Sequence, residues 1–133
     1  MEQIHERMSS PPITVQADSS YQRALRLMDD HQLHHLPVVN ATGQLVGIIT
    51  ERDLLLAASH YGSADIEVAE IMHKGAVTAS PAMTIAQAAE LMLQKRIGGL
   101  PVVNEQQHVV GVITETDLLR AFVEMLGVET VEQ

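Results

Sequence analysis

Two short stretches of the sequence each place a hydroxyl and a carboxylate at the same spacing. Thr50 precedes Asp53 in the first stretch, and Thr114 precedes Asp117 in the second. Two interpretations of this Thr-x-x-Asp pattern are open. Each pair can form a capping box, in which the two side chains satisfy free backbone N–H groups at the start of a helix. Each pair can also hold a nucleotide, because helix N-termini bind phosphate and a carboxylate can accept both hydroxyls of a ribose.

Both stretches belong to an internal repeat with an offset of about 64 residues. The sequence Leu-Pro-Val-Val-Asn occurs at 36–40 and again at 100–104, and Gly47 aligns with Gly111. A missing side chain at these glycines lets another backbone or a flat base approach closely. Since units of this size cannot bury a good core alone, we expect them to pack on each other with a pseudo-two-fold relation.

The local patterns predict the order β-α-β-β-α in each repeat, an α+β fold. A first strand at 13–15 or 76–79 precedes a helix capped by Ser19 or Ser20, or by Thr84. A hairpin containing Leu-Pro-Val-Val follows, and the unit closes with a helix at about 51–59 or 115–126. We expect a first repeat at 1–62 (core about 8–60), a linker at 63–71 and a second repeat at 72–133 (core about 72–127).

Composition excludes several classes of function. The 133-residue chain has a formal net charge of -9 and only 8 Lys and Arg, which argues against nucleic acid and anionic membranes as partners. It has no cysteine, and it contains no Gly-x-Ser-x-Gly, Walker or Gly-x-Gly-x-x-Gly motif. No apolar run approaches the roughly 20 residues that span a bilayer. We therefore expect a soluble, cytoplasmic protein that is not an enzyme and needs no metal or other cofactor.

The tandem pattern of Leu-Pro-Val-Val-Asn, a short turn and Gly-x-Ile-Thr-x-x-Asp-Leu-Leu resembles a pair of CBS domains, often called a Bateman module. The resemblance covers about Met8 to Gly127. It implies two clefts between the repeats that bind adenosine compounds (AMP, ADP, ATP or S-adenosylmethionine), a regulatory role such as energy sensing, and a homodimer. An effector protein can be a further partner.

The resemblance also implies site residues, with the aspartate on the ribose and the threonine on sugar or phosphate. The base is expected against the first strand and the residues before Leu-Pro of the opposite repeat. One cleft would combine Thr50, Asp53, Val77, Thr78, Gly98, Gly99 and Leu100. The other would combine Thr114, Asp117, Ile13, Thr14, His34, His35 and Leu36.

The two clefts are not expected to be equal. Arg52 aligns with Thr116 and can neutralise a phosphate. Two glycines (Gly98, Gly99) align with two histidines (His34, His35), so we expect the Thr50–Arg52–Asp53 cleft to bind more tightly.

Three alternatives remain beside the regulatory one. His31 with His34 and His35 could suggest a metal site, but a cleft lining or surface role is favoured. The chain could be a structural or dimerisation module with empty clefts, in which Thr-x-x-Asp is only a cap. A DNA-binding regulator is disfavoured by the charge.

Overall fold

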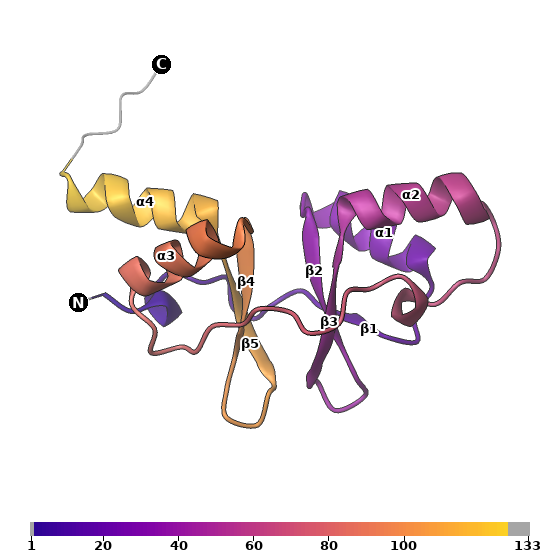
Figure 1. Cartoon of the computed structure of the whole chain (residues 1–133), viewed down its shortest axis with the longest axis horizontal. Coiled ribbons are helices and arrows are strands. Elements are labelled where there is room, and N and C mark those ends of the chain that lie inside the picture. Colours follow the sequence, from indigo (N-terminus) through magenta and orange to yellow (C-terminus); the bar gives the residue numbers. More distant parts are fainter. Residues whose placement is uncertain (1, 128–133) are drawn as a thin grey trace, which may run out of the picture.

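The computed structural model describes residues 2–127 and consists of two similar units side by side (Figure 1). The first repeat contains β1 (Val15–Gln16), α1 (Tyr21–His31), β2 (His35–Val39), β3 (Leu45–Thr50) and α2 (Glu51–Tyr61). The second contains α3 (Ile85–Lys95), β4 (Gly99–Val103), β5 (Val109–Thr114) and α4 (Glu115–Met125). Two short 3-10 helices, η1 (Ile4–Glu6) and η2 (Val68–Glu70), precede the repeats. The predicted α+β fold is confirmed.

Both hairpins bring the residues before Leu-Pro opposite the threonine of their own repeat. In the antiparallel pair β2–β3, His35 lies opposite Thr50. In the pair β4–β5, Gly99 lies opposite Thr114. The hairpin register therefore places an imidazole next to one Thr-x-x-Asp motif and a glycine next to the other.

The first strand of each repeat is shorter than the sequence predicts. In the first repeat it spans only Val15–Gln16, which pairs in parallel with β2, rather than residues 13–15. In the second repeat it is reduced to one parallel bridge, from Ala79 to Val102. Pro81 explains this difference, because it stands where Ala17 donates its N–H to Val39 in the first repeat (3.0 Å). Proline has no N–H, so the ladder cannot continue.

The helix starts agree with the predicted caps. The hydroxyl of Ser20, rather than that of Ser19, accepts from the backbone N–H of Arg23 at the start of α1. Thr84 caps α3 in the same way through the N–H of Gln87. None of the helices within residues 2–127 has the length and apolar character needed to span a bilayer.

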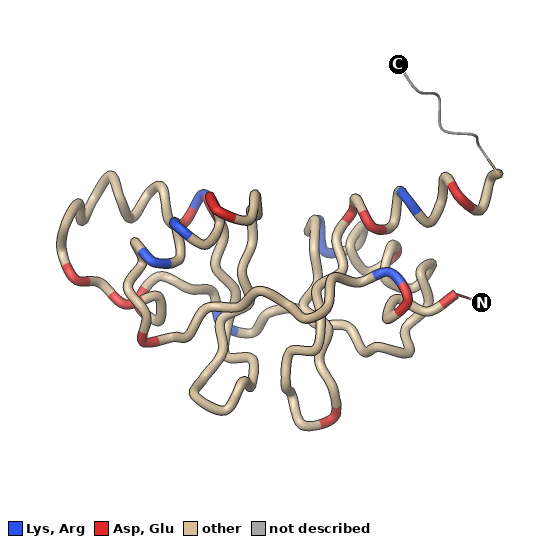
Figure 2. Tube along the Cα trace, turned by 180° about the vertical axis from the view of Figure 1, so that it is seen from behind, with Lys and Arg blue, Asp and Glu red and all other residues tan. Residues whose placement is uncertain are grey.

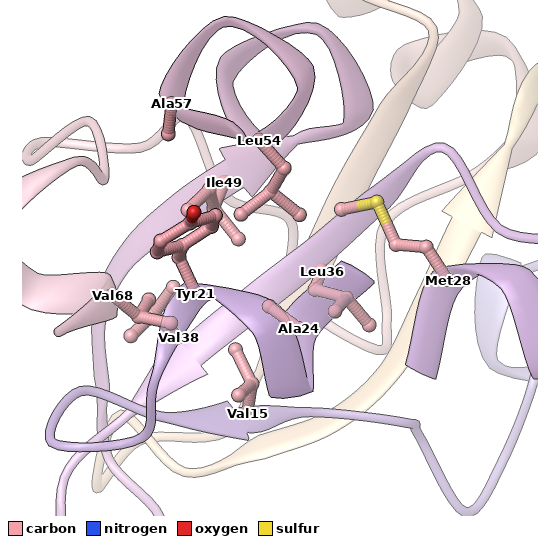
Figure 3. Close-up of a cluster of buried hydrophobic side chains, with 10 residues drawn as sticks. All are labelled: Val15, Tyr21, Ala24, Met28, Leu36, Val38, Ile49, Leu54, Ala57 and Val68. Atoms are coloured by element: carbon pink, nitrogen blue, oxygen red, sulfur yellow. The ribbon is translucent and has the colours of Figure 1, made fainter. Parts of the chain in front are cut away.

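Each repeat has its own aliphatic core, and each core is completed by the segment that precedes the other repeat. Val68, which leads into the second repeat, is fully buried in the first core with Tyr21, Ile49 and Leu54 (Figure 3). Ile4, which leads into the first repeat, is fully buried in the second core. The two connecting segments cross between the units (Figure 1). This exchange ties the repeats together and carries residues of one repeat to the Thr-x-x-Asp motif of the other.

Candidate functional site

Both Thr-x-x-Asp motifs form complete capping boxes. Thr114 donates to Oδ2 of Asp117 from its backbone N–H (2.8 Å) and from its hydroxyl (3.0 Å). Thr50 donates to Oδ2 of Asp53 in the same way (3.0 and 2.7 Å). In return, each aspartate N–H donates to the threonine hydroxyl. Both aspartates therefore act as helix caps. Capping uses mainly Oδ2 of each carboxylate and leaves Oδ1 for a further partner.

A cleft with a volume of about 410 Å³ lies between the repeats, next to the second motif. Its volume lies within the range of about 300–1,000 Å³ that is usual for small-molecule sites. The walls are largely apolar. The lining residues are Ser9, Pro11, Ile13, Gln32, Leu33, His34, His35, Pro37, Ile48, Gly98, Gly99, Leu100, Pro101, Val112, Thr114, Glu115 and Thr116.

The cleft brings together several of the predicted site residues, in a different grouping. Ile13, His34 and His35 lie in the same cleft as Thr114, as the sequence predicts. This cleft is also lined by Gly98, Gly99 and Leu100. The resemblance implies instead that these three residues share the other cleft, with Thr50 and Asp53. The reason is the hairpin register, which keeps Gly98 in its own repeat, where its carbonyl accepts from the N–H of Glu115 (3.1 Å).

The other predicted residues lie outside this lining. Asp117 is not a lining residue, but its half-buried carboxylate is bonded to Thr114, which is one. Leu36 is fully buried in the first core. Thr14 borders a separate polar hollow with Gln16 and Asn40. The remaining five, which the lining of this cleft does not include, are Thr50, Arg52, Asp53, Val77 and Thr78.

The two aspartates differ in their surroundings. Nε2 of His73 lies 3.0 Å from each oxygen of the Asp53 carboxylate. Burial raises the pKa of Asp53, but the hydrogen bonds from Thr50 and the contact with His73 outweigh it, so the pKa is lowered overall. In the part of the chain that the structure describes, no hydrogen bond reaches Oδ1 of Asp117. The second aspartate therefore keeps a free acceptor, although the sequence predicts the first motif to be the tighter site.

The charges around the cleft are acidic. Glu115 lines it, and no Lys or Arg is found among its lining residues within 2–127. Burial lowers the pKa of the half-buried His35, and so does a protonated His34, while Glu115 opposes them. The imidazole of His35, which lines the cleft, is therefore neutral at pH 7. Over the whole molecule, Lys and Arg are scattered among more numerous Asp and Glu (Figure 2).

Two glycines make room for the crossing segments. A Cβ at Gly47 would lie 2.8 Å from the backbone oxygen of His73 and 2.7 Å from Sδ of Met72. A Cβ at Gly111 would collide with the side chain of Met8. The close approach that the sequence predicts at these glycines is thus made by the chain itself, in its backbone and its methionines.

Sequence reasoning missed His73, Ser9, Pro11 and Glu115 as neighbours of the motifs. A signal for the first two was present, because the repeat alignment that pairs Met8 with Met72 also pairs Ser9 with His73. The change from a small serine to an imidazole, directly after an aligned methionine, indicates that the two halves differ near this position.

Comparison with known proteins identifies the family. The CBS domain model matches residues 2–60 and 68–124. A CBS domain-containing protein of Dictyostelium discoideum is 33% identical over 134 residues, which covers 92% of each chain. The solved CBS domain pair of protein MJ0100, in complex with 5′-methylthioadenosine and S-adenosyl-L-methionine, is 32% identical, with a TM-score of 0.84 over 94% of this chain and 98% of that chain.

Other relatives are longer enzymes. L-aspartate semialdehyde sulfurtransferase of Methanocaldococcus jannaschii is 34% identical over 119 residues, which are 90% of this chain but 23% of that protein. The chain thus spans about a quarter of the length of several curated relatives that it matches.

The family model matches both repeats, and the structure shows a Thr-x-x-Asp capping box in each repeat and a cleft that both repeats line. The chain therefore belongs to the CBS domain family and is a CBS domain pair.

Proposed function

We propose that this CBS pair is a regulatory module that binds an adenosine compound in the cleft between its repeats. The observation that carries the proposal is the Thr114–Asp117 capping box at the edge of a cleft of about 410 Å³ built from both repeats. The likeness to the CBS pair of MJ0100, solved with two adenosine compounds, supports the same ligand class here.

The cleft offers a place for each part of such a ligand. The adenine ring packs between apolar side chains from the two repeats, among them the partly exposed Ile13 and Val112. Thr114 lines the cleft and is bonded to Asp117, whose Oδ1 has no hydrogen-bond partner among the described residues. A carboxylate with one free oxygen can accept from a ribose diol while its other oxygen keeps the helix capped.

The charge of the cleft selects among adenosine compounds. Glu115 repels a 5′-phosphate, and the described lining supplies no Lys or Arg to neutralise one. Thr116 stands at the position that Arg52 occupies in the other repeat. We therefore expect a neutral or cationic 5′ group, as in 5′-methylthioadenosine or S-adenosylmethionine, to bind better than AMP, ADP or ATP.

Binding would regulate through the contact between the repeats. A ligand that touches both repeats stabilises the arrangement that binds it, by mass action. If it prefers one of two arrangements, it acts as a switch for an effector protein. This role involves no catalysis by the chain, and we place it in the cytoplasm.

We further propose that the module acts as a homodimer. On α4, Leu119, Phe122 and Met125 are 62%, 54% and 71% exposed, beside an apolar hollow shared with α3. On α2, Leu55 occupies the position that repeats as Leu119 and is 56% exposed. Two matching apolar helix faces on one pseudo-symmetric chain suit a second copy of the same chain.

The alternative is a structural or dimerisation module in which the clefts stay empty. The complete capping boxes favour this reading as far as the aspartates are concerned, because a cap explains both of them without a ligand.

A calorimetric titration separates the two functions. Nucleotide-stripped protein is titrated with S-adenosylmethionine, 5′-methylthioadenosine, AMP, ADP and ATP, and the series is repeated on Asp117→Ala and Asp53→Ala. Binding that Asp117→Ala abolishes and Asp53→Ala preserves supports the regulatory module. Both variants should lose about 0.5–2 kcal/mol of stability as caps. If none of the five compounds gives heat with the wild type, the adenosine proposal fails and the structural module stands.

A further inference from the structure

His73 is held in a fixed position beside the first capping box. Its backbone pairs with Ile48 through two hydrogen bonds, His73 N–H to the Ile48 carbonyl (2.8 Å) and Ile48 N–H to the His73 carbonyl (2.9 Å). Gly47 leaves the space that this pairing needs. The start of the second repeat is therefore hydrogen-bonded to β3, the strand that leads into the helix of Asp53.

From this position, the imidazole covers the carboxylate of Asp53. Nε2 lies 3.0 Å from both oxygens, and Thr50 already donates twice to one of them. The side chain of Asp53 is 18% exposed, whereas that of His73 is 63% exposed. The histidine thus lies on the solvent side of the pair, where a diol would have to approach.

The second half of the molecule has the same backbone arrangement with a different side chain. Ser9 pairs with Val112 through equivalent hydrogen bonds (3.0 and 3.2 Å), at the position that repeats as His73. Ser9 lines the cleft, and no hydrogen bond from it to Asp117 is found in the described residues. A single repeat position therefore separates an aspartate whose two carboxylate oxygens both contact a histidine from one whose Oδ1 has no hydrogen-bond partner among the described residues.

We propose that His73 occupies the ribose position of the first half-site, so that the chain binds one adenosine ligand, at Asp117, rather than two. This inference rests on the proposed function. A ribose at Asp53 would have to displace a hydrogen bond to an ionised carboxylate, which belongs to the stronger class of hydrogen bonds. We expect this displacement to weaken the first half-site at least about tenfold relative to the same site without the histidine.

Exchanging the two side chains tests the inference. Calorimetric titration with 5′-methylthioadenosine measures the number of sites in wild type, His73→Ser, Ser9→His and the double exchange. We expect one site in the wild type and two in His73→Ser. Ser9→His should weaken binding at least about tenfold, and the double exchange should move the single site to Asp53. Both positions are exposed, and circular dichroism checks that each variant folds.

Asp53→Asn in the His73→Ser background assigns the second site. We expect this change to return the number of sites to one. Two sites in the wild type, or one site in His73→Ser, would overturn the role of His73 and leave the proposed function intact. Absence of binding to the wild type and to His73→Ser alike would overturn the proposed function and this inference together.

Discussion

Gly47 and Gly111 are repeat equivalents, but the structure predicts that alanine is tolerated very differently at the two positions. At Gly47, the new methyl group would lie 2.8 Å from the backbone oxygen of His73. At Gly111, its close neighbours are atoms of the Met8 side chain. A methionine has three rotatable bonds and can move away, whereas the His73 carbonyl is tied into the pairing with Ile48.

The expected magnitudes follow from this difference. Forcing an extra methyl against fixed backbone costs typically about 1–3 kcal/mol. At both positions, alanine also restricts the unfolded chain, which returns about 0.4–1 kcal/mol. Gly47→Ala should therefore destabilise the protein by about 1–2 kcal/mol. Gly111→Ala should change the free energy of unfolding by less than about 1 kcal/mol, because the displaced methionine finds another rotamer.

Urea unfolding of the wild type and both variants, followed by circular dichroism, measures the two differences. The matched substitution at equivalent positions removes effects of helix or strand propensity from the comparison. Equal destabilisation, or a larger loss for Gly111→Ala, would refute the argument that fixed backbone rather than side-chain packing requires glycine at 47.

Two further predictions concern pH and assembly. Because burial and His34 lower the pKa of His35, the unfolded chain takes up the proton first, so stability is fully present above about pH 6.5 and falls as the pH drops towards the folded pKa. Urea midpoints between pH 7.5 and 5.5 should fall less for His35→Gln, and an unchanged pH dependence would contradict a half-buried, neutral imidazole at position 35. Leu119→Glu places a charge on the exposed apolar face of α4, so light scattering should show a dimer for the wild type and a monomer for the variant. Equal masses would rule out that face as the contact.

Much of the fold could be predicted from the sequence because its signals are local. The N-cap at Thr84 and a cap at Ser19 or Ser20, of which the structure uses Ser20, follow from capping chemistry, and the hairpins follow from short β-branched runs. The shortened first strands needed more. Pro81 is visible in the sequence, but its effect depends on the parallel pairing with β4, which only the tertiary structure shows.

The candidate site was less predictable, because it is assembled from segments that cross between the repeats. The aspartates and threonines follow from the repeat, and their capping boxes are confirmed. The grouping of Gly98 with Thr114 depends on the hairpin register. The contact of His73 with Asp53 depends on the backbone pairing between His73 and Ile48 of β3. No local sequence pattern specifies this pairing.

The most direct test of the central claim is the crystal structure of the protein with 5′-methylthioadenosine. Our account predicts the adenine ring in the cleft between the repeats and the ribose hydroxyls on the carboxylate of Asp117, with His73 still bound to Asp53. A ligand in the polar hollow beside Thr14, on the apolar face of α4, or with its ribose on Asp53 in place of His73 would contradict the account.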